Sequence, residues 1–316
     1  MMHYSRNFML ALAVSALCFS IFATRRAAAQ EIISTCLKDK DYLGKLEANA
    51  AAGDVESIIE LADEHRLGLC YQANVTKGEG LLKRAADLGS LDAIYILAQS
   101  FYSDRNGTRA RISIRKEKSR NLYLHLGNNG YAPAQFDLGM FYLRGLNGFP
   151  RQSSVALQWF EKAAKSGHMR AARQAAIMRL RGHDTVKADP LVGEQWLRGA
   201  AQGGDLVATK LLAEYLLEQD ATKYLAEVIQ LYEYLAKKGL HAVGVELGRL
   251  YRDFNQPETA YFWYKIAEAS GERVADKEAR KMEYRMDHQK LQGIMARVNK
   301  FVEENPSLNR LYNEDM

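Results

Sequence analysis

The chain has 316 residues, of which 47% are hydrophobic and 26% are charged, and its formal net charge is +5. This composition is typical of a globular protein with enough apolar residues to form a large core. Only five prolines are present, which argues against a disordered or linker-rich chain.

The first thirty residues differ in composition from the rest of the chain. An apolar run spans Phe8–Ala23, and the small residues at 27–29 resemble a signal-peptidase cleavage site. We therefore predict a secretory signal peptide over residues 1–29 and a periplasmic location, because the run is shorter than the roughly 20 residues of a spanning helix. Arg25 and Arg26 follow the run, where positive charge weakly opposes export, so a membrane anchor formed by an uncleaved N-terminal segment is the alternative.

A basic stretch interrupts the otherwise even distribution of charge. Ser103–Arg120 contains seven Lys and Arg residues against only Asp104 and Glu117. Without residues 1–29 the chain has 40 basic and 38 acidic residues, so everything outside this stretch carries a net charge of about −3. The stretch is therefore a local feature on a mildly acidic body and not part of a generally basic surface.

The body of the chain repeats itself, which is typical of a solenoid. Glycines recur at intervals of 35 to 41 residues, as Gly53, Gly89, Gly130, Gly167, Gly204 and Gly239. The ninth residue after each of these glycines is small: Ala62, Ala98, Gly139, Ala176, Ala213 and Gly248. Two adjacent bulky positions precede each following glycine: Leu81-Leu82, Leu122-Tyr123, Trp159-Phe160, Trp196-Leu197, Leu231-Tyr232 and Phe262-Trp263.

Apolar residues within each repeat are spaced by three and four positions, which predicts two helices, called A and B. The glycine is expected to end helix B in a left-handed conformation, which causes a glycine no steric strain. The small residues allow neighbouring helices to approach closely, and the bulky residues fill the groove between repeats. Because one repeat cannot bury both of its faces alone, we predict an all-α solenoid of about six antiparallel helix pairs with a concave face.

This register divides the chain into segments. Residues 30–52 are expected to form an N-terminal capping helix, and residues 53–271 form the repeat solenoid. Residues 272–305 are more polar and lack the glycine period, so we expect C-terminal capping helices that shield the last apolar face. Residues 306–316 are predicted to be a polar tail.

The third repeat, APAQFDLGMFYLRGLNGFPRQSSVALQWFEKAAKSG at residues 132–167, resembles the Sel-one-like repeat family, a relative of tetratricopeptide repeats. The resemblance covers roughly residues 53–271. The second repeat departs from the family pattern because it is long, and the fourth has Ala175 where leucine is usual. Members of this family are mostly adaptors that bind other proteins and share no catalytic residues, so the resemblance implies protein binding without naming a partner.

Two cysteines, Cys36 and Cys70, remain after removal of the predicted signal peptide. An even number of cysteines in an exported chain suggests one disulfide bond. Cys36 precedes the capping helix and Cys70 follows helix A of the first repeat, and in an antiparallel array these positions lie at the same end of the stack. We therefore predict a Cys36–Cys70 disulfide, which would stabilise the N-terminal cap by about 2–4 kcal/mol.

No specific catalytic or metal-binding motif is present in the sequence, and we predict no cofactor. The only coincidence is Ser113-Ile114-Arg115-Lys116, which matches the S-x-x-K nucleophile motif of penicillin-binding enzymes. That chemistry also needs S-D-N and K-T-G elements, which the chain lacks. We interpret Ser113 as the N-cap of helix B and rank a beta-lactamase-like hydrolase last among the functions.

Three tryptophans and one histidine are of types that often bind ligands, but we interpret them as packing residues. Trp159, Trp196 and Trp263 occupy the bulky positions of helix B, which favours the core over a sugar- or peptide-binding surface. His65 stands where other repeats have Phe101, Tyr142 and Tyr251, so packing is favoured over metal ligation.

Two groups of residues are predicted to bind a partner. The first lies in the basic stretch, where Ser103–Ile112 is expected to be a loop with about four to six extra residues (judged from the glycine intervals) that packing does not require. The second is expected to line the concave face through helix A. The predicted residues are Arg105, Arg109, Arg111 and Arg115 in the first group, and Gln135, Asp137, Arg173, Arg179, Lys210, Glu214 and Arg249 in the second.

We therefore predict a non-enzymatic exported scaffold that binds a protein partner in the cell envelope, of the type that regulates a signalling or polysaccharide-export system. The alternative is binding of a polyanion, such as an acidic polysaccharide or lipid headgroups, through residues 105–120. Nucleic acid is not expected as a partner, because the body of the chain is not basic. A monomer is favoured, with no stable membrane span after signal cleavage.

Overall fold

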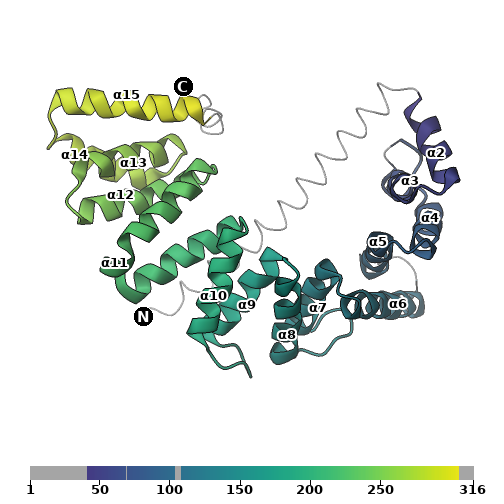
Figure 1. The fold of residues 1–316 in the computed structure, drawn as a ribbon. Coiled ribbons are helices and arrows are strands. Elements are labelled where there is room, and N and C mark those ends of the chain that lie inside the picture. The colour runs from purple at the N-terminus through teal and green to yellow at the C-terminus, as the bar shows by residue number, and fades with distance from the viewer. Residues whose placement is uncertain (1–40, 69, 104–107, 306–316) are drawn as a thin grey trace. The chain divides into compact units, whose positions relative to one another are not determined.

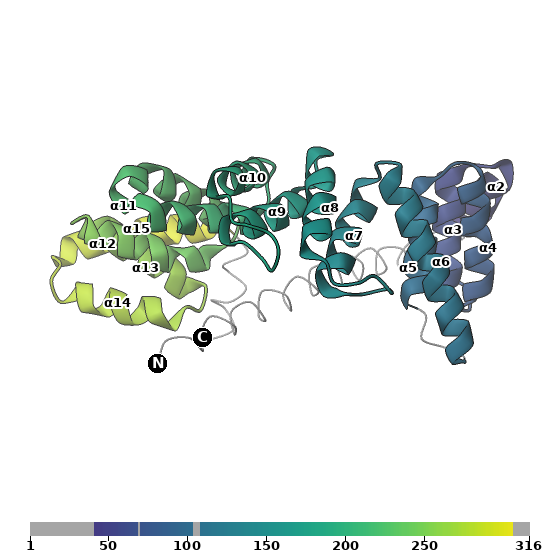
Figure 2. The same ribbon diagram turned by 90° about the horizontal axis from the view of Figure 1, so that it is seen from below.

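The computed structural model describes residues 41–68, 70–103 and 108–305, and every regular element in this part of the chain is a helix, apart from one isolated bridge between His183 and Val186. The chain divides into an N-terminal unit, residues 1–152, and a C-terminal unit, residues 153–316. Figures 1 and 2 show the helices of both units. The prediction of an all-α chain of antiparallel helix pairs is confirmed.

The N-terminal unit contains the cap and the first two and a half repeats. Its helices are α2 (Tyr42–Ala52), α3 (Val55–Leu67), α4 (Val75–Asp87), α5 (Leu91–Ser103), α6 (Arg109–Asn128) and α7 (Ala132–Arg144). Each helix packs against the next along the chain. Helices α3 and α5 are therefore the A helices of the first two repeats, α4 and α6 are their B helices, and α7 is the A helix of the third.

The C-terminal unit contains the rest of the repeats and the C-terminal helices. Its helices are α8 (Ser153–Lys165), α9 (Met169–Arg181), α10 (Pro190–Gln202), α11 (Leu206–Lys237), a short 3-10 helix (His241–Val243), α12 (Gly244–Asp253), α13 (Pro257–Ala269), α14 (Arg273–Glu283) and α15 (His288–Glu304). Helices α8 to α13 again pack consecutively.

The glycines that define the repeat end the B helices in the predicted way. All six have a left-handed backbone, with φ between 81° and 95°. The N–H of Gly53 donates to the carbonyl of Ala50, and the N–H of Asp54 donates to the carbonyl of Asn49, each at 3.1 Å. The same pair of hydrogen bonds recurs at each of the other five glycines. This turn satisfies the last carbonyl groups of the helix and reverses the chain, and a side chain at this φ would be strained.

The small and bulky columns explain how the helices pack. The small residues are buried throughout, and the second bulky column is at most 5% exposed from Leu82 to Trp263. At Gly248 a Cβ atom would lie 2.5 Å from the ring of Tyr264, so α12 and α13 contact each other directly at this point. Trp159 and Trp263 are buried and Trp196 is half-buried against the same core, as the sequence predicts.

A glycine in this column is expected to be required for stability. Gly248→Ala places a Cβ against the fully buried Tyr264 ring and is expected to destabilise the protein by about 1–3 kcal/mol, because the ring has to move. Gly293→Ala is the matched control, since a Cβ in this part of α15 meets no atom within 4 Å. The control is expected to stabilise by about 0.5–1 kcal/mol through helix propensity. Urea unfolding measures both, and equal midpoints for the two variants would contradict the packing argument.

The fifth repeat departs from the expected helix–loop–helix form. Its A and B helices join in α11 with a kink at Asp220, where φ is −162° and ψ is 98°. The Asp220 carboxylate accepts hydrogen bonds from the N–H groups of Thr222 (3.0 Å) and Lys223 (2.9 Å). Asp220 thus caps a new helix directly where the previous one ends, which removes the need for a loop.

The last repeat is covered by the two helices that follow it. Helices α14 and α15 both pack against α13. Ala279 of α14 and Val298 of α15 are buried, and the ring of Phe301 lies edge-on to Trp263 with centroids 5.9 Å apart. These contacts remove the apolar face of α13 from water, which is what a capping element must do.

At the other end, α2 is bound to the first repeat through a buried carboxylate. Tyr42 donates a hydrogen bond to Glu60 at 2.7 Å and a longer one to the fully buried Glu64 at 3.4 Å, and Glu64 also accepts one from the N–H of Cys70 at 2.9 Å. Burial raises the pKa of Glu64, although these hydrogen bonds oppose the shift. Cys36 lies outside the described residues, so the Cys36–Cys70 disulfide stays a prediction.

His65 is a packing residue, as the repeat register predicts. It is 3% exposed, and its ring stacks on Tyr71 with centroids 4.4 Å apart. Neither ring nitrogen has a hydrogen-bond partner among the described residues. Burial lowers the pKa of His65, the positive charge of Lys77 adds to this, and Glu47 opposes it.

This burial makes His65 a source of acid sensitivity. Because the folded-state pKa lies below the unfolded value of about 6.5, stability is complete above that pH and falls as the pH drops toward the folded-state pKa. His65→Phe copies Phe101 of the second repeat and keeps the stacking on Tyr71. We expect it to stabilise by about 1 kcal/mol at pH 7, because two unsatisfied nitrogens are removed. In urea unfolding between pH 7 and 5, the free energy of unfolding of the variant should change less with pH than that of the wild type. An equal pH dependence of the two proteins would contradict the assignment of His65 as the source.

Candidate interaction surface

The basic stretch is mostly helix and not loop. Helix α6 begins at Arg109, where the Thr108 hydroxyl accepts a hydrogen bond from the N–H of Arg111 at 3.3 Å. The prediction that Ser113 is the N-cap is wrong: Ser113 is an exposed residue one full turn inside the helix. Thr108 is an equally good capping residue, and the choice between the two depends on packing further along α6. Arg105 lies outside the described residues.

Arg115 is a structural residue, which corrects its prediction as a partner-binding side chain. It forms an ion pair with Glu79 of α4 at 2.5 Å, and the two side chains are only 14% and 11% exposed. Ser100 of α5 donates to the same carboxylate at 2.9 Å, and the guanidinium lies 4.6 Å from the centre of the Phe101 ring. Burial raises the pKa of Glu79, but the hydrogen bonds from Arg115 and Ser100 outweigh it and hold the pKa below its usual range.

Arg109 and Arg111 are exposed, but they lie on α6 and not in the loop in which they were predicted, and their role in partner binding stays a prediction. Sequence reasoning did not include two further exposed residues of the same helix, Ile114 and Lys118. Ile114 is 54% exposed. Arg111, Ile114 and Lys118 are spaced by three and four residues, so they lie along one side of the helix. If the helix began at Ser113, Arg111 would lie outside it and the stripe could not be recognised. Because the helix begins after Thr108, all three residues belong to it.

Two residues predicted for the concave face support the fold of the N-terminal unit instead. Gln135 is 5% exposed, and its amide donates to the carbonyl of Gly127 at 2.9 Å. Asp137 is half-buried and accepts a hydrogen bond from the hydroxyl of Tyr95 at 2.8 Å. Burial, followed by the Asp137 charge, raises the pKa of Tyr95. The prediction of partner contact is wrong for Gln135, which is buried against the preceding repeat. For the half-buried Asp137, partner contact stays a prediction.

The arginines predicted on α9 are also bound within the fold of the C-terminal unit. Arg173 is 3% exposed and pairs with Asp205 at 3.1 Å. Asp205 also caps α11 by accepting a hydrogen bond from the N–H of Ala208. Arg179 pairs with Glu161 of α8 at 2.7 Å and is partly buried. The prediction of partner contact is therefore wrong for Arg173, and Arg179 contributes a packed ion pair.

Three predicted residues remain on the surface of the C-terminal unit. Lys210 and Glu214 on α11 lie 3.8 Å apart with side chains 42% and 47% exposed, and Arg249 on α12 is exposed. An i,i+4 pair of this exposure contributes only a few tenths of a kcal/mol. These side chains are available to a partner without loss of stability, so their role as a binding surface stays a prediction.

Two serines of the described residues, Ser113 and Ser153, have surroundings that are relevant to a nucleophile. Ser113 and Lys116 lie on one helix, and Ser113 is exposed to water. In the C-terminal unit, the buried Ser153 hydroxyl donates to Asp184 at 2.7 Å and lies 3.0 Å from Nδ1 of His183. The same Nδ1 is also the atom nearest Asp184, at 3.3 Å, so the carboxylate cannot orient the ring from its opposite nitrogen as in a proton relay. This cluster ties the α9–α10 loop to the start of α8.

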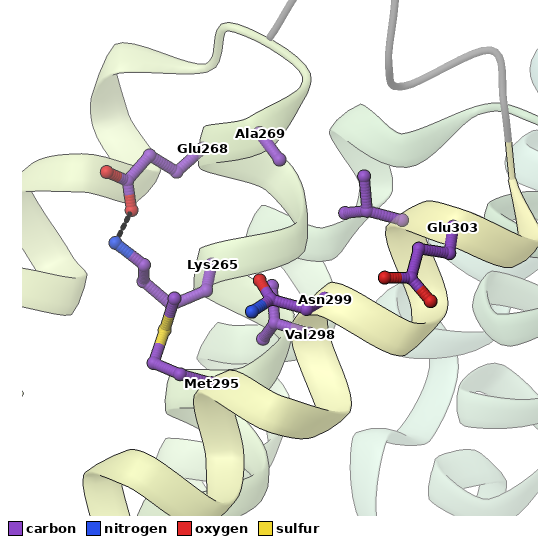
Figure 3. A pocket seen from close by; sticks show the side chains of 8 residues that line it. Lys265, Glu268, Ala269, Met295, Val298, Asn299 and Glu303 are labelled. Atoms are coloured by element: carbon purple, nitrogen blue, oxygen red, sulfur yellow. Dashed lines mark ion pairs between the residues drawn. The ribbon is translucent and has the colours of Figure 1, made fainter.

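The hollows in the described part of the chain are small. One of about 200 Å³ lies between α13 and α15. Figure 3 shows its apolar wall of Met295 and Val298 and its rim, where Lys265 pairs with Glu268 at 2.5 Å. A second hollow of about 250 Å³ lies at the start of α13. Sites for small molecules usually measure about 300–1,000 Å³.

Across residues 41–68, 70–103 and 108–305, no group of three or more His, Cys, Asp or Glu side chains could hold a metal ion. No helix within these ranges is long and apolar enough to cross a membrane.

The comparison with family models agrees with the repeat register. The Sel1 repeat model matches residues 55–90, 132–168, 170–205 and 231–272. The stretches between the matches, 91–131 and 206–230, contain the long helix α6 and the kink of α11. These are the places where the geometry departs from the common repeat.

Two curated relatives are similar in sequence. The chain is 27% identical over 250 residues to the chitin synthase regulator SKT5 of Saccharomyces cerevisiae, with 76% of this chain and 36% of the relative covered. It is 33% identical over 72 residues to the cytochrome c oxidase assembly factor 7 of Xenopus tropicalis, with 23% and 31% covered. The chain thus spans about a third of the length of the curated relatives that it matches.

Two solved structures are similar in fold. A protective antigen of uropathogenic Escherichia coli that displays an SLR fold has a TM-score of 0.57 at 20% identity, with 85% of this chain and 57% of the other covered. A Sel1 repeat protein from Oxalobacter formigenes has a TM-score of 0.52 at 21% identity, with 76% and 96% covered. The matched repeats and the shared fold together show that this chain carries Sel1 repeats arranged in an α-solenoid of the SLR type.

Proposed function

We propose that this protein is a non-enzymatic adaptor that is exported to the cell envelope and binds a protein partner there. The observation that carries the proposal is the division of labour between its residues. The residues that define the repeat are buried between helices or form the glycine turns, whereas the exposed residues differ from repeat to repeat. Such a surface is already ordered, so a partner binds it at little conformational entropy cost.

The relatives support a regulatory or assembly role. One is named as a regulator of chitin synthase, and the other as an assembly factor of cytochrome c oxidase. A solenoid offers a long, ordered surface on which such a role can be carried out by protein binding. We extend the proposal to regulation of a signalling or polysaccharide-export system in the envelope.

Export is supported by the sequence alone. Residues 1–29 have the composition of a secretory signal, and Cys36 and Cys70 are the two cysteines beyond it. N-terminal sequencing of the protein from the periplasmic fraction of a bacterial host should give a chain that starts at Gln30 with both cysteines oxidised. Full-length protein in the cytoplasm with free thiols would overturn this part of the proposal.

Protein binding is tested by site-specific photo-crosslinking of the full chain in envelope preparations. A photoreactive residue at Arg249 or Glu117, both exposed, should give one defined protein adduct. The same residue at Gln230, exposed on the B half of α11, serves as the control for random encounter. Equal adducts at all three positions, or none, would count against an adaptor.

A further inference from the structure

Helix α6 is longer than the other B helices, and the additional part projects from the packed repeat. Helices α4, α8, α10 and α13 each have 13 residues, whereas α6 has 20. Counted back from its terminal glycine, α6 begins seven residues earlier than α4, α8 and α10 do. We call residues 109–115, which add two turns or about 10 Å, the overhang.

The overhang is held in place by specific contacts. Thr108 caps its first turn, and Arg115 fixes its base to Glu79 of the preceding repeat. An isolated two-turn helix does not form in water, because nucleation is costly. The overhang therefore persists as a rigid extension of a packed helix, and it presents side chains in a fixed arrangement.

The exposed side chains of the overhang and the following turn are basic, with one aliphatic residue among them. Arg111, Ile114 and Lys118 form one stripe, and Arg109 lies a turn before Ile112 at the tip. Ile114 is 54% exposed. Over residues 109–120 the only acidic residue is Glu117. We call Arg109, Arg111, Ile114 and Lys118 the overhang surface.

The charge arrangement of the overhang surface is unfavourable for the helix alone. The partial positive charge at a helix N-terminus favours acidic residues in the first turn and disfavours basic ones. Helix α6 has no acidic residue in its first turn, and it begins with two arginines. An acidic ligand on this surface would interact favourably with the positive end of the helix dipole and with the basic side chains.

We propose that the overhang surface binds an acidic segment of a partner protein, rich in Asp and Glu and with an aliphatic side chain that covers Ile114. This inference rests on the adaptor function proposed above and names the chemistry of the partner at one place on it. An acidic polysaccharide carries no aliphatic side chain that could cover the exposed Ile114 between the cations. A lipid surface needs a broad apolar face, whereas Ile114 is flanked by polar residues and Ile112 is half-buried.

The probe is a fluorescein-labelled peptide, EELEELEE, with the peptide QQLQQLQQ as its uncharged control. Fluorescence anisotropy with the full chain should show binding of the first peptide and none of the second. The variant Arg109→Glu/Lys118→Glu should weaken binding about tenfold, and Ile114→Ala should weaken it roughly fivefold. The charge-matched control is Lys237→Glu/Lys277→Glu, two exposed lysines of the C-terminal unit, which should bind the peptide as the wild type does.

Further arms separate the other polyanions from a protein segment. Polygalacturonate and vesicles with 30% phosphatidylglycerol are titrated in the same assay. The inference is overturned if either binds more tightly than the acidic peptide, if Ile114→Ala has no effect, or if the charge-matched control loses binding equally. Circular dichroism confirms that the variants remain helical.

The photo-crosslinking experiment separates failure of this inference from failure of the adaptor function. A defined adduct that survives in the Arg109→Glu/Lys118→Glu variant would leave the adaptor function intact and overturn the overhang surface as its contact. Loss of the adduct in this variant, with retention in the charge-matched control, is the expected result.

Discussion

Replacement of Arg115 by alanine is expected to destabilise the N-terminal unit by about 3 kcal/mol. The ion pair with Glu79 is almost completely buried, and removal of one partner leaves the other as an unpaired buried charge. The exposed Arg109→Ala in the same helix is the control and should change stability by less than about 0.5 kcal/mol. Urea unfolding at pH 7 measures both variants.

The pH dependence identifies the cause of this loss. The lowered pKa of Glu79 means that the wild-type pair stabilises above the unfolded glutamate pKa of about 4.3, and that this stabilisation is lost as the pH falls through the folded-state pKa. In Arg115→Ala the buried carboxyl group gains stability on protonation, so the deficit should be smaller at pH 4 than at pH 7. Adding Glu79→Gln to Arg115→Ala should restore part of the lost stability at pH 7. If neither the lower pH nor Glu79→Gln reduced the loss of stability, the unpaired charge of Glu79 would not be its cause.

The Arg173→Ala variant should lose about 3–5 kcal/mol, again through a buried ion pair. Here the partner, Asp205, is both the orphaned charge and the N-cap of α11, so the start of that helix is weakened as well. Burial lowers the pKa of Arg173, and the negative charge of Asp205 opposes this shift.

Arg249→Ala is the appropriate control for Arg173→Ala. Both residues lie on A helices of the C-terminal unit and both were predicted as partner contacts, but Arg249 is exposed. Thermal unfolding should therefore show a large decrease for Arg173→Ala and almost none for Arg249→Ala. If the C-terminal unit contributes to partner binding, Arg249→Ala should weaken the affinity for the partner more than Arg173→Ala does. Equal thermal shifts for the two variants would refute the structural assignment of Arg173.

The repeat register could be read from the sequence because it depends on local requirements. A glycine such as Gly239 is needed for the left-handed turn, and Ala213 and Tyr232 are buried in the same core. Each requirement restricts one position to few residue types, and the restriction recurs in every repeat. Periodicity therefore predicted the helices, the glycine turns that end the B helices and the buried columns.

The surface residues could not be read in the same way. The spacing of Arg173 on its helix resembles that of an exposed residue, but a long side chain can reach the next repeat, and its partner Asp205 is 32 positions away. Arg115 and Glu79 are 36 positions apart, again about one repeat. A search for opposite charges separated by one repeat would have identified both pairs as structural. The start of α6 was predicted wrongly because Thr108 and Ser113 are both residue types that cap helices, and the sequence alone does not show which of them does so.

These charge pairs also affect how each unit opens. Within the units, Arg115–Glu79, Arg173–Asp205 and Arg198–Glu227 each join one repeat to the next, whereas Arg252–Glu278 joins the last repeat to the capping helix α14. In a repeat array, the strength of such neighbour contacts decides whether repeats open singly or together. Amide hydrogen exchange should therefore proceed through concerted opening of the repeats that share buried pairs, and separately in α14, whose pairs Arg252–Glu278, Arg280–Asp276 and Lys281–Glu278 are more exposed.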